Sequence, residues 1–251
     1  MRIVIVSDLH ANAEALQVLP RDYDELWILG DLVNYGPSPV EAVDFARANA
    51  SLIVRGNHDH SAGFGKDPRC SDPFRAMAQA TGRFTASLLT EDRKQFLRDL
   101  PTQAERKVDG VRFLACHALP SNPLYEYCMA DSDRWREEVA DIPADILLTG
   151  HTHVPFQRKI GSKLIVNPGS LGQPKHGRAE ACYAVWDGRS VQLCAAPYDV
   201  DETVRKIQAL SLPANIEQDL ASVLRTGALP KLTGRVAGAA GSSCDQYDPW
   251  Q

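Results

Sequence analysis

The sequence predicts an α/β fold with two packed β-sheets that contain both parallel and antiparallel strands. The first 54 residues alternate short apolar strands with helical segments, whereas most of the second half is short strands joined by turns. Alternating strands and helices indicate parallel strands with helical crossovers, and strands joined by tight turns indicate antiparallel hairpins. Polar loops directly follow the strands, which places a candidate site at one edge of the sheets.

The first half begins with a strand over Ile3–Val6, whose continuous apolar run is typical of a strand covered on both faces. Helical spacing follows over residues 12–19, with Asn12 as the N-cap and Pro20 as the stop. The remaining elements of this half are a strand over 26–29, a helix over 39–48 and a strand over 52–54. This order favours a parallel sheet.

The middle of the chain, residues 72–100, is predicted to be helical and to end at Pro101. Turns at Gly161-Ser162 and Asp187-Gly188 predict hairpins and therefore antiparallel pairing in the second half. The predicted strands of this half cover residues 112–116, 146–148, 156–159, 164–166, 182–186 and 191–195.

Two further helices are predicted over residues 201–209 and 214–224. The domain is therefore expected to cover residues 1–227. Residues 228–251 are rich in Gly, Ala and Ser, and we expect a flexible C-terminal tail there.

The composition is that of a globular protein: 251 residues, 44% hydrophobic and 24% charged. A formal net charge of −5, without a run of Lys and Arg, argues against nucleic acid as an obligate partner. No apolar stretch approaches the roughly 18 residues that span a bilayer, and the N-terminus lacks a signal-peptide pattern. The six cysteines include no C-x-x-C pair, so we expect reduced thiols and a cytoplasmic protein without a membrane partner.

Five of the seven histidines lie in short polar segments that directly follow predicted strands, and Asp31 lies in a similar segment. The segments are Asp8-x-His10, Gly30-Asp31, Gly56-Asn57-His58-Asp59, His117 and Gly150-His151-Thr152-His153. Because loops at the carboxyl ends of parallel strands meet at one sheet edge, several metal-ligand side chains are expected to gather there.

The residue types in these segments point to a metal site. Carboxylate, imidazole and amide oxygen suit Mn²⁺, Fe and Zn²⁺, and the absence of cysteine excludes a Cys-rich structural zinc site. Residues two apart in an extended segment point the same way, so Asp8 with His10, and His151 with His153, are expected to converge. Seven candidate ligands are too many for one ion and suit two ions about 3.5–4 Å apart, an arrangement typical of phosphoester hydrolases.

In type, order and position at strand ends, these segments resemble the calcineurin-like metallophosphoesterase superfamily, which has D-x-H, G-D, G-N-H-[DE], a lone H and G-H-x-H in that order. The resemblance covers residues 1–170 and implies a four-layer αββα sandwich of two mixed β-sheets flanked by helices. Further blocks resemble the small bacterial and archaeal phosphodiesterase branch: Asn34-Tyr35-Gly36-Pro37, Asn167-Pro168-Gly169-Ser170 and Gly172-Gln173-Pro174.

The resemblance also implies a role for each residue of the segments. The first ion would be held by Asp8, His10 and His153. The second would be held by Asn57, His117 and His151, with Asp31 as the bridge. His58 would contact the phosphate and protonate the leaving oxygen, and Asp59 would orient His58 or its loop. A hydroxide between the ions would attack phosphorus, with Mn²⁺ as the expected metal and Fe, Zn²⁺ or Ni²⁺ as alternatives.

The leading hypothesis is a hydrolase of small phosphodiesters or nucleotide-type phosphate esters. A phosphomonoesterase and a dinucleoside polyphosphate hydrolase remain alternatives. A non-catalytic scaffold of the same fold is disfavoured by the retention of His58 and all seven ligands. Protein phosphatases of the superfamily have an arginine in the loop after the bridging aspartate, where this chain has Asn34-Tyr35.

Three residues outside the ligand segments have two interpretations each. Tyr35 could stack on an aromatic leaving group or pack in the interior. Lys175 and Arg178 could bind a phosphate, although solvated charges are the more economical interpretation. The lone histidine departs from the small branch, because Ala118-Leu119-Pro120 follows His117 where glycine and serine are usual.

Overall fold

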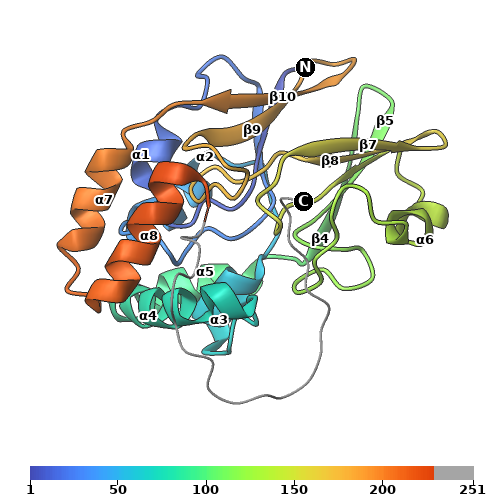
Figure 1. Cartoon of the computed structure of the whole chain (residues 1–251). Helices are drawn as coiled ribbons and strands as arrows, with labels where there is room; N and C mark the ends of the chain where they lie inside the picture. Colours follow the sequence, from blue (N-terminus) through green and yellow to red (C-terminus); the bar gives the residue numbers. More distant parts are fainter. Residues whose placement is uncertain (229–251) are drawn as a thin grey trace.

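The first strand, β1 (Ile3–Val6), lies in the middle of a five-stranded sheet in the computed structural model, which describes residues 1–228 (Figure 1). The strand order is β10-β9-β1-β2-β3. The other strands are β2 (Glu25–Ile28), β3 (Leu52–Ile53), β9 (Ala181–Trp186) and β10 (Val191–Ala196). The pairs β1–β2 and β2–β3 are parallel, which confirms the prediction for the first half, whereas β9 pairs antiparallel with β1 and β10.

A second five-stranded sheet has the order β4-β5-β6-β8-β7. Its strands are β4 (Gln103–Val108), β5 (Val111–Cys116), β6 (Ile146–Leu148), β7 (Phe156–Ile160) and β8 (Lys163–Asn167). The predicted hairpins β7–β8 and β9–β10 are antiparallel, but β5, β6 and β8 pair in parallel. Antiparallel pairing was therefore the wrong prediction for the centre of this sheet. The helix α6 (Arg134–Ala140), which the sequence analysis missed, lies in the crossover between β5 and β6.

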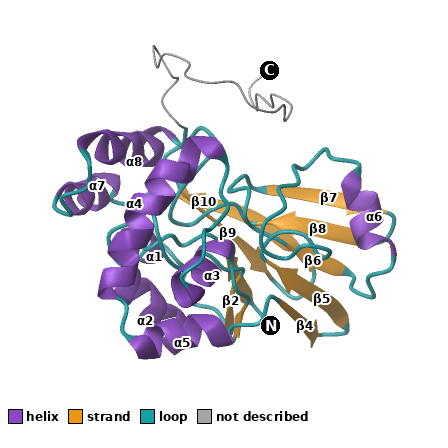
Figure 2. Cartoon of the chain, turned by 90° about the horizontal axis from the view of Figure 1, so that it is seen from below, coloured by secondary structure: helices purple, strands orange, loops and turns teal. Residues whose placement is uncertain are grey.

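The two sheets pack face to face, and helices cover their outer faces (Figure 2). Helices α1 (Ala13–Leu16), α2 (Pro39–Asn49) and α5 (Glu91–Asp99) contribute to the core outside the first sheet, whereas α6 covers the second sheet. This is the predicted αββα sandwich. It also explains the unbroken apolar run of β1, because Val4 and Val6 face the helices while Ile3 and Ile5 face the second sheet.

Aromatic side chains lie at the centre of the contact between the sheets. The Phe113 ring lies edge-on to Trp27 at 5.1 Å and to Trp186 at 5.3 Å between ring centroids. All three side chains are at most 2% exposed. Such edge-to-face pairs add to the stabilisation that burial itself provides.

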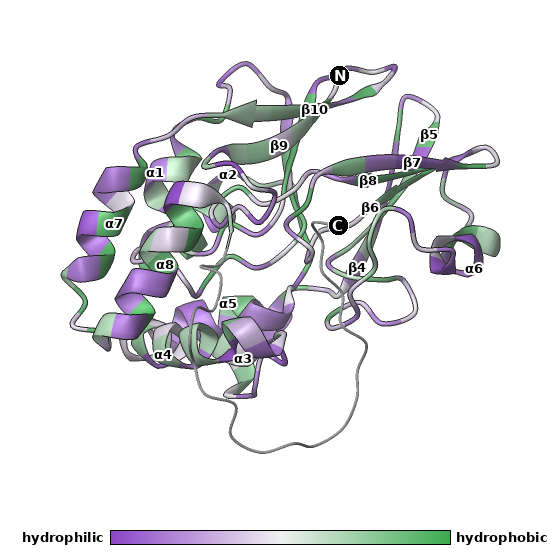
Figure 3. Ribbon diagram, in the orientation of Figure 1, coloured by the Kyte–Doolittle hydropathy of each residue, from purple (hydrophilic) through white to green (hydrophobic). Residues whose placement is uncertain are grey.

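Besides α6, three further parts of the fold differ from the prediction. The helical segment 72–100 is two helices, α4 (Asp72–Leu88) and α5, because Leu89 and Thr90 have extended backbones. Helix α3 (Asn57–Phe64) starts where a loop was expected. Strand β4 was missed because it is a polar edge strand. The other edge strand, β7, is also largely hydrophilic (Figure 3), which discourages pairing with another chain.

The described chain ends with α7 (Val200–Gln208) and α8 (Ala214–Thr226), close to their predicted bounds. From residue 229 onward, the predicted tail lies outside the part of the chain that the structure describes. None of the helices within residues 1–228 combines the length and the apolar character that crossing a bilayer requires.

Candidate metal centre

The predicted ligands come together at the carboxyl ends of strands from both sheets. Asp8 and His10 follow β1, Asp31 follows β2 and His117 follows β5. Asn57 begins α3 after β3, and the pair of histidines 151 and 153 follows β6. All seven predicted ligands are at most 2% exposed, so the polar groups are clustered inside the protein. Buried polar groups of this density require partners.

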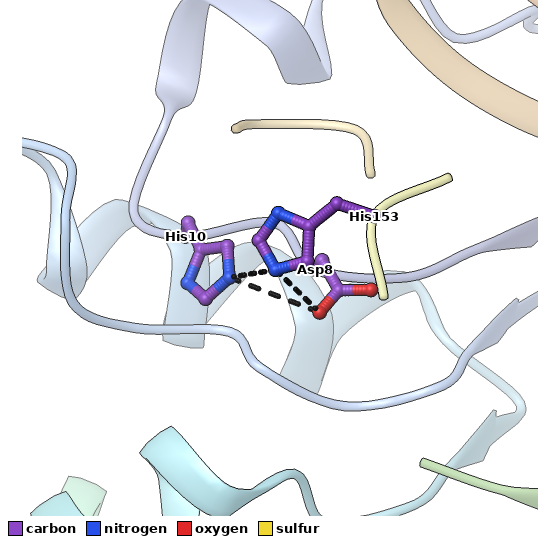
Figure 4. A group of neighbouring side chains, drawn as sticks. All are labelled: Asp8, His10 and His153. Atoms are coloured by element: carbon purple, nitrogen blue, oxygen red, sulfur yellow. Dashed lines mark hydrogen bonds and ion pairs between the residues drawn. The ribbon is translucent and has the colours of Figure 1, made fainter. Parts of the chain in front are cut away.

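One group of ligands consists of Asp8, His10 and His153 (Figure 4). The Nε2 atoms of the two histidines are 3.2 Å apart. Asp8 Oδ1 lies 3.3 Å from His153 Nε2 and 3.8 Å from His10 Nε2. Three donor atoms that converge in this way suit one divalent ion with open positions for water or substrate.

The second group consists of Asp31, His117 and His151. His117 Nε2 lies 3.1 Å from His151 Nδ1 and 3.3 Å from Asp31 Oδ2. Asn57 joins this group, because its Oδ1 lies 3.1 Å from His117 Nε2 while its amide nitrogen donates to the carbonyl of Pro68 at 2.7 Å. That bond turns the amide oxygen of Asn57 toward the group.

Asp31 lies between the two groups. Its Oδ2 is 3.3 Å from His117 Nε2 and 3.8 Å from His10 Nε2, and its Oδ1 accepts a hydrogen bond from the backbone N–H of His58 at 2.8 Å. Asp31 Oδ2 and Asp8 Oδ1 are buried and have no hydrogen-bond partner within residues 1–228. Two unpartnered carboxylate oxygens among imidazoles fit a pair of cations bridged by Asp31.

Backbone carbonyls fix the tautomer of each histidine in the two groups. A carbonyl oxygen can only accept, so the ring nitrogen that contacts it carries the proton and the other nitrogen offers its lone pair. The contacts are His10 Nδ1 with Val33 O at 3.1 Å, His117 Nδ1 with Leu29 O at 2.8 Å, His153 Nδ1 with Gln173 O at 2.6 Å and His151 Nε2 with Tyr125 O at 3.3 Å. In all four rings the nitrogen that does not contact the carbonyl faces the ligand groups.

The backbone of the ligand loops is strained rather than extended. Asp8, His10, Asp31, His151 and His153 have φ values of 55°, 45°, 56°, 67° and 61°, in the left-handed region. Asp8 and His10 lie in the same ligand group, as predicted, whereas the predicted convergence of His151 and His153 was wrong, because they lie in different groups. Neither pair has the extended backbone on which the prediction was based. Strain of this kind concentrates at functional sites.

Two glycines of the motifs make room for the carboxylates. A Cβ at Gly56 would lie 2.1 Å from Asp31 Oδ1, and one at Gly150 would lie 1.9 Å from Ser7 Oγ and 2.9 Å from Asp8 Oδ2. The glycines that precede Asn57 and His151 are therefore required for the close approach of these loops.

The charges of the metal-free groups follow from burial and from the two carboxylates. Burial lowers the pKa of His10, His151 and His153 well below the usual value, so these rings are neutral. Burial acts in the same direction on His117, but Asp31 and Asp8 outweigh it and raise the pKa of His117 to about 9. The three neutral imidazoles are in the form in which histidine binds metals, whereas His117 has to release a proton when an ion binds.

His58, the predicted catalytic residue, is buried next to the ligands without belonging to either group. Its ring is edge-on to His10 at 5.1 Å between centroids, and its Nδ1 lies 2.9 Å from the side-chain amide nitrogen of Asn34. Burial lowers the pKa of His58 to about 4. With Asn34 Nδ2 as the donor, His58 Nε2 carries the ring proton.

Asp59 does not contact the ring of His58. Its carboxylate accepts backbone N–H bonds from Asp31 and Leu32 at 2.8 Å each and from Gly56 at 3.0 Å. It therefore ties the loop of the bridging aspartate to the start of α3, which supports the role of ordering the loop that carries His58.

The structure also separates the residues that had two interpretations. Tyr35 is 2% exposed and packs against His10 and His58, which supports the packing role. Sequence reasoning missed Tyr127, whose 42% exposed side chain stacks on His151 with ring centroids 4.0 Å apart. No local pattern around Tyr127 distinguishes it from other tyrosines, because the contact joins residues far apart in sequence.

Two ligand groups with Asp31 between them, at the carboxyl ends of strands from two packed sheets, define a candidate dinuclear metal centre of a phosphoester hydrolase. The model of the calcineurin-like phosphoesterase superfamily domain matches residues 1–190, and the chain belongs to this family.

An uncharacterised protein of Methanocaldococcus jannaschii is 30% identical over 234 residues, which cover 84% of this chain and 93% of that protein. The crystal structure of a metallophosphoesterase from Sphaerobacter thermophilus has 29% identity and a TM-score of 0.75, over 88% of this chain and 99% of that chain. A symmetrical bis(5'-nucleosyl)-tetraphosphatase of Vibrio parahaemolyticus is 29% identical over 129 residues, covering 47% of this chain and 44% of that protein.

Proposed function

We propose that the protein is a two-metal phosphodiesterase that hydrolyses small phosphodiesters or nucleotide-type phosphate esters, with Mn²⁺ as its metal. The observation that carries the proposal is the position of Asp31 Oδ2, unpartnered between the two ligand groups. Two divalent ions bound there would supply positive charge to the phosphoryl oxygens and lower the pKa of a bound water. The protein's own contribution is the geometry of the ligands and a proton donor.

His58 is the proton donor of this proposal. Its Nε2 carries the ring proton because Nδ1 is held by Asn34, and its ring lies beside the first ligand group. A neutral imidazole in this position can hydrogen-bond the leaving oxygen and give it the Nε2 proton as the ester bond breaks, and the imidazolate so formed would take a proton back from water.

The loop after Asp31 supports a diester substrate. This loop has Asn34, which contacts His58, and the buried Tyr35. Neither side chain carries the positive charge that would bind the phosphate of a protein phosphomonoester. Tyr127, a residue that is 42% exposed, stacks on His151 and would offer an aromatic surface to a nucleobase.

The test compares hydrolysis of bis-p-nitrophenyl phosphate and p-nitrophenyl phosphate by Mn²⁺-reconstituted protein, with the metal-free protein as the control. We expect a higher kcat/KM on the diester, followed by cleavage of nucleotide diesters. A preference for the monoester would replace the proposal by a phosphomonoesterase.

A dinucleoside polyphosphate hydrolase is the second candidate, and the partial similarity to symmetrical bis(5'-nucleosyl)-tetraphosphatases favours it. The two candidates differ in products. Chromatography after incubation with diadenosine tetraphosphate would show ADP as the only product for symmetrical cleavage, whereas the leading proposal predicts that this substrate is cleaved poorly.

A further inference from the structure

The loop after β8 returns to the first ligand group and is hydrogen-bonded to it. The N–H of Gly172 and the hydroxyl of Ser170 both donate to the carbonyl of Asp8, at 3.0 and 2.8 Å. The backbone carbonyl of Gln173 accepts a hydrogen bond from His153 Nδ1 at 2.6 Å. The backbone just before Lys175 is therefore fixed relative to two ligands of the same group.

Lys175 points its ammonium at this group. Its Nζ lies 3.4 Å from His153 Nε2, the atom that faces Asp8 Oδ1, and the side chain is half-buried. The same Nζ lies 3.9 Å from the centroid of the Phe74 ring and 5.9 Å from that of Tyr35. Aromatic faces hold a cation in place without neutralising it.

Among the described residues, the carboxylates that act on the charge of Lys175 are those of the ligand groups, Asp8 and Asp31, and bound ions would neutralise them. In the metal-free protein the carboxylates of Asp8 and Asp31 attract the ammonium. Divalent ions bound to these carboxylates would repel the ammonium instead, since like charges a few ångströms apart in a protein interior repel strongly. An anion between the ammonium and the ions would offset this repulsion, and in a phosphoester hydrolase that anion is a phosphoryl group.

The other basic residue of the loop has no such position. The Arg178 side chain is 73% exposed and lies 3.7 Å from Glu180, so it is a solvated and paired charge. The interpretation as a solvated charge is supported for Arg178, whereas the contacts of Lys175 contradict it.

We propose that Lys175 is a phosphate-binding residue whose ammonium contacts a non-bridging oxygen of the phosphoryl group held at the metal centre. This inference rests on the proposed hydrolysis of phosphate esters. Lys175 would supply, from the loop after β8, the positive charge that the loop after Asp31 lacks. A point charge on a flexible stem suits a tetrahedral anion that changes shape during reaction.

The test measures binding of inorganic phosphate by calorimetry to Mn²⁺-loaded wild type, Lys175→Met, Lys175→Arg and Arg178→Met. Methionine keeps the apolar stem over Phe74 and removes the charge, arginine keeps the charge, and the Arg178 variant removes one charge from the same loop. We expect phosphate to bind about 10- to 100-fold more weakly to Lys175→Met, as for loss of a charge-assisted hydrogen bond. Lys175→Arg should bind more tightly than Lys175→Met, and Arg178→Met should bind like wild type.

Metal content and substrate charge separate phosphate binding from a structural role. Mass spectrometry should find two ions per chain in every variant, and Lys175→Met should lose more kcat/KM on a dianionic monoester than on a monoanionic diester. Equal phosphate binding by Lys175→Met and wild type, loss of an ion in Lys175→Met, or equal losses on both esters would overturn the inference. Absence of phosphate binding to fully loaded wild type would do so as well.

The two proposals fail in different ways. Turnover by wild type with unchanged phosphate binding in Lys175→Met would refute the role of Lys175 alone. Phosphate binding that depends on Lys175, without turnover of any phosphoester, would refute the proposed function and leave the role of Lys175 intact.

Discussion

At the scale of single residues, the histidines of the ligand groups and Asn57 each have one side-chain nitrogen hydrogen-bonded to a backbone carbonyl. Each imidazole of the two groups has one nitrogen on a backbone carbonyl, and Asn57 has its amide nitrogen on Pro68. The free atom of each side chain therefore faces the centre before any ion arrives, which lowers the cost of ordering the ligands on binding.

Replacing His58 by alanine is expected to reduce turnover of the best substrate at least about tenfold, because the proton donor to the leaving oxygen is lost. The loss should be smaller for a leaving group that needs no proton, such as p-nitrophenolate. Steady-state kinetics on both kinds of ester, at equal metal content, check this. An equal loss on both would show that His58 does not act as the acid.

Asp31→Asn is expected to reduce the bound Mn²⁺ from two ions per chain to fewer than two. Asp31 Oδ1 is held by the backbone N–H of His58, and a neutral amide oxygen in the place of Oδ2 would bridge two cations far more weakly than a carboxylate oxygen. Metal analysis after dialysis measures this. Asp44→Asn is the matched control, since Asp44 pairs with Arg93 on the surface and belongs to neither ligand group. Retention of two tightly bound ions by the Asp31 variant would contradict the bridge.

At the scale of elements, the ligand loops depend on contacts with segments far along the chain. Asn12, the N-cap of α1, donates its amide to the carbonyl of Gly172 at 2.8 Å and accepts the hydroxyl of Thr203 in α7 at 3.1 Å. Glu14 also accepts from Thr203, and it pairs with Lys206. Helix α7 therefore supports the loop that carries Asp8 and His10.

Thr203→Val is expected to lower the free energy of unfolding by about 1–3 kcal/mol, because it removes the buried hydroxyl that Asn12 Oδ1 and Glu14 Oε2 share as a donor. The control is Thr85→Val: Thr85 is equally buried, but its hydroxyl has no partner within residues 1–228. Urea unfolding should show an unchanged or higher free energy of unfolding for the control. Equal losses in the two variants would show that the network around Asn12 contributes nothing specific.

At the scale of the whole molecule, the metal-free protein concentrates neutral imidazoles in its interior. Burial lowers the pKa of four of them, His10, His58, His151 and His153. Burial raises the pKa of Asp8 to about 6 and that of Asp59 to about 7. On acidification from about pH 6.5 to 5, the unfolded chain gains protons on four histidines, whereas the folded chain gains them mainly on two aspartates.

The metal-free protein is therefore expected to lose stability as the pH falls through this range, since the unfolded state binds more protons. Melting temperatures in the presence of a chelator, measured between pH 5 and 7, check the sign. A melting temperature that rises on acidification would show that the carboxyl groups outweigh the imidazoles.

Much of the fold and the site could be predicted because the signals are local. Apolar runs such as Ile3–Val6 mark the strands, and the ligand segments follow them directly. What could not be predicted depends on distant contacts or on backbone angles. The positive φ values of His151 and His153 leave no mark in sequence, since neither residue is glycine. Lys175 and Arg178 differ only in what the folded chain places beside them.

The division of the ligands between the two sheets has a consequence for folding. Each ligand group takes residues from both: Asp8 and His10 come from the first sheet and His153 from the second, while Asp31 and Asn57 from the first meet His117 and His151 from the second. Neither half of the chain can assemble a complete group alone. Ion uptake would therefore wait until the sheets have docked, and bound ions would then act as a cross-link that opposes their separation.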